Sequence, residues 1–252
     1  MQQFTPLKAA GLQLVPGFAN LIFFTIFALW FDSIGLPPLM ALAAAVLFAE
    51  VPVSWWIMRK VTRMETGGDF DLAVTFPWRT SIPWWQYLVI GLPLIVFGMI
   101  VIGAMTPAIS AAIRSALDLN IPAWFLLEPD PAMFSSMSHE VLIAMWFSSL
   151  LVFAGIGGIS QELYALGFLL PRTQTLGRLA PLFNAVVFGI FHLAAPWSWP
   201  GFALLAIPWA YLTWWKRSVK FGLVGHVGML LLQTLLMGTI VFGLVSPERM
   251  GG

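Results

Sequence analysis

Long apolar runs separated by short polar connections dominate the hydrophobic pattern of this chain. Each run approaches the ~20 residues that cross a hydrocarbon core as a helix, and none shows the period-two alternation of membrane strands. The pattern therefore predicts an all-α fold, a polytopic bundle of seven transmembrane helices. The predicted spans cover residues 10–31, 34–58, 83–105, 140–171, 179–195, 201–215 and 221–244.

The fourth run is longer than a single span requires. As one helix, residues 140–171 would extend about 48 Å, against a hydrocarbon core about 30 Å thick. The glycines of "AGIGGIS", residues 154–160, are typical of a kink or a break in a helix. A break there would produce an eighth span, so seven and eight spans remain alternatives.

The polar connections are too short to hold a soluble domain. The two longest, residues 59–82 and 106–139, each have fewer than 35 residues, whereas a domain usually needs ~50 or more. We therefore expect one membrane domain over residues 1–252. Within the second connection, "PAISAAIRSALDL" predicts a helix with one apolar face, either at the membrane interface or packed on the bundle. That face consists of Ile109, Ala112, Ile113 and Leu117.

Composition excludes a soluble protein. Of the 252 residues, 60% are hydrophobic and 9% are charged, and the mean hydropathy of +0.89 lies far outside the range of soluble domains. The chain has no cysteine, which excludes disulfides, thiolate metal sites and cysteine nucleophiles. Membrane lipids are the partners expected from this composition, and no nucleic acid is expected.

Basic residues predict the orientation, since short positively charged connections stay on the cytoplasmic side. With seven spans and the N-terminus inside, ten of the 12 Lys and Arg lie on the inner side, and Arg114 and Arg249 lie outside. The outer connection is instead acidic, with Asp118, Glu128 and Asp130. We therefore predict an integral protein of the cytoplasmic (inner) membrane of a prokaryote, with its N-terminus inside.

Four ionisable side chains lie within predicted spans, where a charge is costly and a functional site is the default hypothesis. They are Glu50, Glu162, His192 and His226. At about 1.5 Å per residue, each lies roughly 9 to 21 Å from a basic residue at the inner end of its span. All four can therefore share one depth and converge on one cavity. The alternative for each is a structural hydrogen bond between helices.

Two imidazoles and a carboxylate in a wet cavity are sufficient to activate water and to stabilise an oxyanion, the minimum for peptide hydrolysis. The same set could bind zinc, but its wide separation and the lack of an H-E-x-x-H pattern disfavour a metal site. No other cofactor is predicted. Glu50 is hypothesised to line the same cavity, although a local role at a helix bend near Pro52 is favoured.

Three segments carry a family resemblance in their order and context: "QELYALGFLLPR", "FNAVVFGIFHLAAPW" and "KFGLVGHVGMLLLQ". Together they resemble the CAAX prenyl endopeptidase and bacteriocin-processing (CPBP, or Abi) family of intramembrane proteases, with motifs E-E-x-x-x-R, F-x-x-x-H and H-x-x-x-N. The similar core covers residues 145–240. The resemblance implies that the leading glutamate and the first histidine activate water, and that the second histidine and the asparagine hold the oxyanion.

The second motif is complete in this chain, and the third has lost one polar residue. Phe188 and His192 match F-x-x-x-H, one helical turn apart. His226 keeps the histidine of the third motif, whereas Leu230 stands at the asparagine position. Because leucine has no donor, one of the two oxyanion groups implied by the resemblance is missing.

The first motif has lost two polar residues. Glu162 matches the second glutamate, but Gln161 replaces the leading glutamate and Leu166 replaces the arginine. A glutamine amide has no basic lone pair at neutral pH, so Gln161 cannot accept the proton of water. Without the arginine, a buried Glu162 is expected to be protonated, or to seek His192, His226 or water.

Three functions remain open, and with them whether the chain is an enzyme. The favoured one is a degenerate member, a pseudoprotease that keeps the fold and the cavity and binds another membrane protein, a peptide or a lipid-like group. The second is an active intramembrane endopeptidase in which Glu162 and His192 act on water and His226 acts on the oxyanion. The third is an unrelated small transporter or enzyme, for which the sequence has no positive motif.

Overall fold

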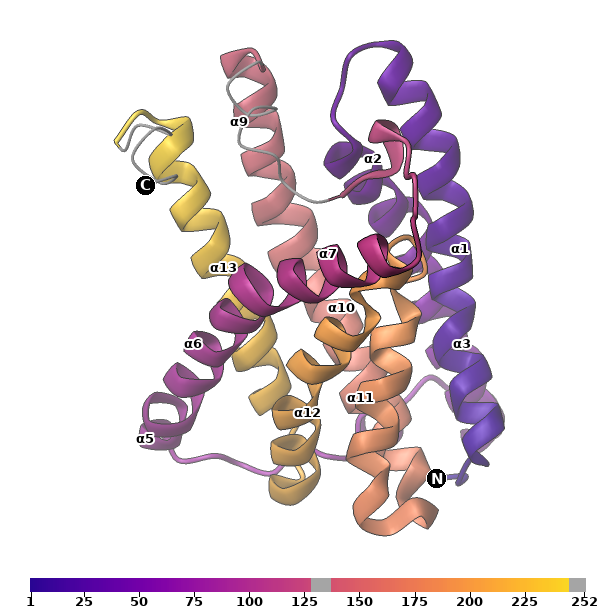
Figure 1. Ribbon diagram of the computed structural model, residues 1–252. Helices are drawn as coiled ribbons and strands as arrows, with labels where there is room; N and C mark the ends of the chain where they lie inside the picture. Colours follow the sequence, from indigo (N-terminus) through magenta and orange to yellow (C-terminus); the bar gives the residue numbers. More distant parts are fainter. Residues whose placement is uncertain (128–136, 245–252) are drawn as a thin grey trace.

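The computed structural model describes residues 1–127 and 137–244. Within these ranges the chain is helical and contains no β-strand, only an isolated bridge between Arg79 and Ser218. The predicted all-α helical bundle is confirmed (Figure 1). Three of the charges used to predict the orientation, Glu128, Asp130 and Arg249, lie outside the described residues.

Several of the long helices change pitch along their length, because π-helical segments (η1, η2, η3, η5 and η6) interrupt the α-helices. The first half contains α1 (Pro6–Ser33), α2 (Pro38–Ala45), η1 (Val46–Glu50), α3 (Val51–Thr66), α4 (Leu72–Thr75), α5 (Trp84–Gln86), η2 (Tyr87–Gly91), α6 (Leu92–Ile100), η3 (Val101–Met105) and α7 (Thr106–Ala116). The second half contains η4 (Ala123–Phe125), α9 (His139–Ser148), η5 (Ser149–Gly157), α10 (Gly158–Glu162), η6 (Leu163–Leu169), η7 (Leu170–Leu179), α11 (Ala180–Phe191), η8 (Pro196–Ser198), α12 (Trp199–Lys216) and α13 (Lys220–Val241).

Among the described residues, five continuous helical stretches are long and apolar enough to cross a membrane. They are Pro6–Ser33, Pro38–Thr66, Trp84–Ala116, His139–Phe191 and Lys220–Val241. The exact prediction of seven or eight spans is therefore not confirmed. The difference arises mainly in the fourth stretch, where two predicted spans are counted as one, and in α12, which is not among the five.

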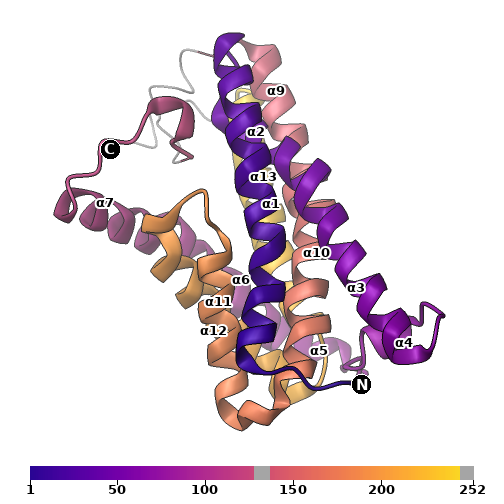
Figure 2. The ribbon, with the colours of Figure 1, turned by 90° about the vertical axis from the view of Figure 1, so that its right-hand side faces the viewer.

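The fourth stretch turns back on itself at the lower end of the molecule. Its backbone leaves helical geometry at Thr173 and Gly177, and Gly177 has a φ of 57° that favours glycine. Figures 1 and 2 both show α9 and α10 descending to this turn and α11 rising from it. By contrast, the chain stays helical through residues 154–160, where the sequence allowed a break.

The helices that surround the predicted site come from both halves of the chain. α1 packs on α2, η1 and α11, while α13 packs on α6, α10, η5 and α12. Figure 2 shows α1 lying along the bundle, close to α11. The largest cluster of buried side chains includes Trp209 of α12 and Phe221 of α13, both fully buried. This core fixes the inner helices on which the site is built.

The contact between α11 and α12 is unusually close. A Cβ added to Gly189 would lie 2.6 Å from the carbonyl oxygen of Trp199 and 2.9 Å from both the nitrogen and the Cβ of Ala203. Only glycine therefore allows the two backbones to touch, as small residues do between membrane helices. The indole of Trp199 also donates a hydrogen bond, 3.0 Å long, to the carbonyl of His192.

The helix predicted in the second long connection is present as α7, which continues from α6 and η3 and lies across the bundle in Figure 1. Its buried residues are Thr106 and Ser110, and the hydroxyl of Ser110 lies 2.9 Å from that of Ser198. Of the expected apolar face, Leu117 is 64% exposed. α7 thus packs through small polar residues, because these allow closer approach than the larger apolar side chains.

The outer surface of the bundle is strongly apolar. On α1, the side chains of Phe18, Ile22, Ile26 and Leu29 are each more than half exposed. Apolar side chains at this spacing on one helical face are what a helix presents to lipid tails. The chain is therefore an integral membrane protein, in agreement with its composition.

Candidate active site

A cavity of about 590 Å³ opens within the bundle. Most of its lining side chains are apolar, and a few polar ones converge on it from separate helices. Those that matter here are Asn20, Glu50, Gln161, His192 and His226. They come from α1, η1, α10, the end of α11 and α13. Residues spread over more than 200 positions of the chain therefore meet at one place.

Glu162 points to His226 and does not line the cavity. Its Oε1 lies 2.8 Å from Nδ1 of His226, and the side chain is 1% exposed. The pairing fits the expectation that Glu162, deprived of the arginine, seeks a histidine. Its other oxygen, Oε2, has no hydrogen-bond partner in the described part of the chain. Glu162 therefore orients the imidazole of His226 and lies behind it.

The position of Glu162 requires a glycine on the neighbouring helix. A Cβ on Gly222 of α13 would overlap the Glu162 carboxylate and lie 2.5 Å from Cδ1 of Leu166. Leu166 thus fills the space beside Glu162 with an apolar side chain, where the resemblance would place an arginine. The imidazole of His226 also stacks on Trp209, with ring centroids 4.9 Å apart.

His192 lies just beyond the last residue of α11 and is held by its own backbone. Its Nδ1 lies 2.9 Å from the carbonyl oxygen of Phe188. Since a carbonyl only accepts, Nδ1 carries the ring proton and Nε2 keeps its lone pair. The ring stacks on Phe202 at a centroid distance of 4.3 Å. Phe188 contacts both histidines edge-on, at 5.0 Å from His192 and 6.0 Å from His226.

Glu50 lies in the same cavity as the two histidines, with 2% of its surface exposed. Its Oε2 accepts a hydrogen bond from Nδ2 of Asn20 at 2.6 Å, and its Oε1 accepts one from Nε2 of Gln161 at 2.7 Å. The favoured expectation, a local role at the bend near Pro52, is therefore wrong. The polar partners of Glu50 lie on α1 and α10, because the carboxylate points across the bundle.

Wide helical turns precede both polar stretches. η1 ends at Glu50, and η5 ends just before α10, which carries Gln161. Such π-helical turns are rare and occur frequently at functional sites. A Cβ on Gly157 would lie 2.7 Å from Cγ1 of Val46, so this glycine allows η1 and η5 to approach. The approach brings the side chains of Glu50 and Gln161 into contact.

Sequence reasoning missed Asn20. The prediction rests on ionisable side chains within the spans, whereas a buried amide in an apolar helix also requires a hydrogen-bond partner. Asn20 is 7% exposed and lies near the middle of the α1 sequence. An amide in an apolar run, such as Asn20 or Gln13, is the signal that could identify it.

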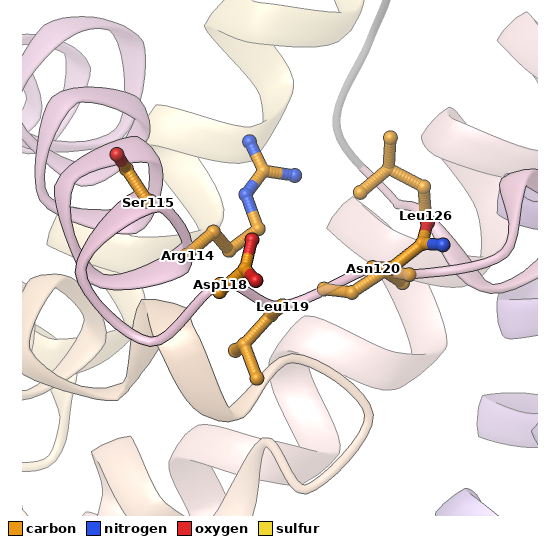
Figure 3. Close-up of a pocket in the computed structure, with 7 residues that line it drawn as sticks. Arg114, Ser115, Asp118, Leu119, Asn120 and Leu126 are labelled. Carbon is orange, nitrogen blue, oxygen red and sulfur yellow. The ribbon is translucent and has the colours of Figure 1, made fainter.

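The described residues contain no group of three or more His, Asp or Glu side chains that could hold a metal ion. The zinc alternative thus finds no ligand set within 1–127 and 137–244. A second hollow, of about 330 Å³, lies at the end of α7 (Figure 3). It is lined by Arg114, Asp118 and their neighbours and shares only Leu126 with the large cavity.

Comparison with known families locates one similarity. Residues 143–232 match the family described as type II CAAX prenyl endopeptidase Rce1-like. This segment is about a third of the chain, and it contains Gln161, Glu162, His192 and His226. The resemblance inferred from the three motifs is thereby confirmed. Neither a search of curated proteins nor a search of solved structures found a match.

Proposed function

We propose that the protein is an intramembrane endopeptidase, because residues 143–232 match the family described as type II CAAX prenyl endopeptidase Rce1-like. One observation carries the proposal: two imidazoles with defined orientations open onto a cavity that also holds a carboxylate. Glu162 orients His226, the Phe188 carbonyl orients His192, and both rings line the cavity. The loss of polar residues from the motifs is an argument against hydrolysis. We give more weight to the arrangement of the two histidines, which favours it.

The reaction is the addition of water to a peptide carbonyl. Nε2 of His192 has the free lone pair that can accept a proton or a hydrogen bond from water, whose oxygen then bonds to the carbonyl carbon. His226 shares one proton with Glu162 through Nδ1 and carries a second proton on Nε2. The Nε2–H group can therefore donate a hydrogen bond to the developing oxyanion. The carbon–nitrogen bond then breaks, and the proton taken from water passes to the leaving nitrogen.

The histidines provide the test. Purified protein is reconstituted into vesicles with a total membrane-protein extract, and newly formed N-termini are labelled and identified. We expect His192→Ala and His226→Ala to lower the initial rate of cleavage about 100-fold or more, since the first removes the group that binds the attacking water and the second removes an oxyanion donor. His139→Ala is the matched control, because His139 is exposed at the start of α9. Equal cleavage by all four proteins would contradict the proposal.

A second candidate is binding without turnover, the pseudoprotease hypothesis. The observation that favours it is Leu230, which lines the cavity at the position where the resemblance implies an oxyanion donor. In that case the cavity would hold a segment of another membrane protein, a peptide or a lipid-like group. A partner that co-purifies in gentle detergent, together with identical N-termini for wild type and the His192→Ala/His226→Ala variant, would favour binding.

The proposed location is the cytoplasmic membrane of a prokaryote, with the N-terminus inside. The distribution of basic residues along the chain supports this location. Most of them lie in segments at the lower end of Figure 1: the C-terminal part of α3, η7 and the α12–α13 connection.

A further inference from the structure

The carboxylate of Glu50 lies one hydrogen bond away from the side chain that stands at the family's leading glutamate position. We propose that Glu50 is the proton-accepting carboxylate of this site. It lies on a different helix from position 161 and performs the role that the resemblance assigns to the leading glutamate. The inference rests on the proposed endopeptidase function. It assigns the acceptor to η1, outside residues 143–232.

The contact with Gln161 supports a carboxylate on η1 in place of one at position 161. Nε2 of Gln161 lies 2.7 Å from Oε1 of Glu50. A glutamate at position 161 would place its own carboxylate at that distance from Glu50, and two carboxylates so close can hardly both be ionised. Glutamine removes this conflict and donates a hydrogen bond instead. The pair therefore consists of one carboxylate, on η1, and one amide, at position 161.

Asn20 completes the arrangement. Its Nδ2 donates to the second oxygen of Glu50 at 2.6 Å, so each carboxylate oxygen has one fixed amide donor. Amide donors hold a carboxylate in place without protonating it, and each of its oxygens keeps a further lone pair. The carboxylate can therefore still accept a proton. Both Asn20 and Gln161 also line the cavity, so the oriented carboxylate lies at its wall.

The alternative is a purely structural polar contact between three helices. Against it stands the position of the contact: Glu50 shares one cavity with His192 and His226 and lies at the end of a π-helical turn. A structural contact would serve equally well outside the cavity, whereas a proton acceptor must reach the water that attacks.

The chemical step balances with water as co-reactant. An oxygen of Glu50 accepts a proton from the water molecule oriented by Nε2 of His192, while the water oxygen bonds to the peptide carbonyl carbon. The carbon–nitrogen bond then breaks, and the carboxylic acid returns the proton to the leaving amine nitrogen. Glu50 ends the cycle as it began, and one water molecule is consumed.

An exchange of the two side chains tests the proposal. Cleavage in vesicles is measured as above for wild type, Glu50→Gln, Gln161→Glu and the double variant. We expect Glu50→Gln to lower the rate about 100-fold or more, the effect of losing a proton acceptor. The double variant should recover at least 10-fold over Glu50→Gln, because it returns the carboxylate to position 161 and reverses the same hydrogen bond. Gln161→Glu alone should be slower than wild type, since its two carboxylates must share a proton.

Three further measurements separate a chemical from a structural role. The acidic limb of the pH–rate profile reports protonation of Glu50 as well as of His192, so Glu50→Gln should change its shape and the double variant should restore the wild-type shape. Melting temperatures in detergent should show that Glu50→Gln is folded. Glu140→Gln, an exposed carboxylate in the first turn of α9, is the matched control and should cleave as wild type does.

The outcomes are distinguishable. Full activity of Glu50→Gln, or a double variant no faster than Glu50→Gln, overturns the role of Glu50 while leaving the endopeptidase function intact. Absence of cleavage by the wild-type protein overturns the proposed function itself, and the role of Glu50 with it.

Discussion

Glu162 and His226 form a pair whose geometry depends on a residue with no side chain. The carboxylate lies against Gly222 of α13, four residues before His226 on the same helix. The glycine therefore leaves the space that lets a carboxylate reach behind the imidazole. At the residue scale, the alignment of His226 is determined by steric fit as much as by hydrogen bonding.

We predict that Gly222→Ala displaces the Glu162 carboxylate. The added methyl group would overlap it and Leu166, and overpacking of this kind costs about 1–3 kcal/mol. The free energy of unfolding in detergent should fall by that amount, and the cleavage rate should fall by more than the loss of folded protein explains. Gly11→Ala on α1 is the control, because nothing lies within 4 Å of the added carbon. Equal melting temperatures and rates for both variants would contradict the prediction.

Glu50 shows why the contacts of individual site residues could be predicted only in part from the sequence. Distance along a helix gives the depth of a side chain, so the sequence could state that Glu50, Glu162, His192 and His226 share a level. Which side chains then pair depends on the rotation of each helix and on its neighbours. The amide donors of Glu50 come from α1 and α10, and no periodicity in the sequence encodes that choice.

Arg172 joins several elements at the lower end of the bundle. Its guanidinium group is fully buried and lies 2.9 Å from Glu65 of α3. It also donates to the carbonyls of Phe168, Val74 and Thr75. One side chain of η7 thereby holds α3, the short helix α4 and the end of η6 together. The turn that reverses the chain after α10 is stabilised by this network.

We predict that Arg172→Met lowers the free energy of unfolding by about 3–5 kcal/mol, because it leaves Glu65 buried without its charged partner. The double variant Arg172→Met/Glu65→Leu removes both charges and should lose less than the single variant. Chemical denaturation in detergent measures both. If the single variant proves no less stable than the double variant, the pair is not what stabilises this turn.

The elements themselves were largely predictable, and their irregularities were not. The apolar run 10–31 marks α1 (Pro6–Ser33), and the run 221–244 marks α13 (Lys220–Val241), within a few residues at each described end. Hydrophobicity predicts where a helix crosses the membrane, since it measures transfer into lipid. It does not predict the π-helical turns η1 and η5, because these depend on contacts such as that of Gly157 with Val46.

At the scale of the whole molecule, the two ends of the described bundle differ in their charge and in which terminal helix end lies there. Figure 1 shows the start of α1 at the lower end and the end of α13 at the upper end. The segments rich in Lys and Arg lie at the lower end, whereas the segment after α7 lies higher up. This asymmetry is the support for the proposed orientation, in which the inner face lies at the bottom of Figure 1.

We predict that Asp69→Cys faces the cytoplasm and Asn120→Cys the outside. Both positions are exposed, and the chain has no other cysteine, so a membrane-impermeant maleimide reports on each alone. Intact cells should be labelled at Asn120→Cys and not at Asp69→Cys. Permeabilised cells should be labelled at both, which is the control. Labelling of Asp69→Cys in intact cells would reverse the orientation.

The backbone contact at Gly189 has a mechanical consequence. α11 and α12 touch there, the carbonyl of His192 accepts a hydrogen bond from Trp199, and the ring of His192 stacks on Phe202. A displacement of the α11–α12 hairpin would therefore move His192 with it. Under the proposed endopeptidase function, a substrate that entered by displacing this hairpin would therefore find His192 out of its catalytic position.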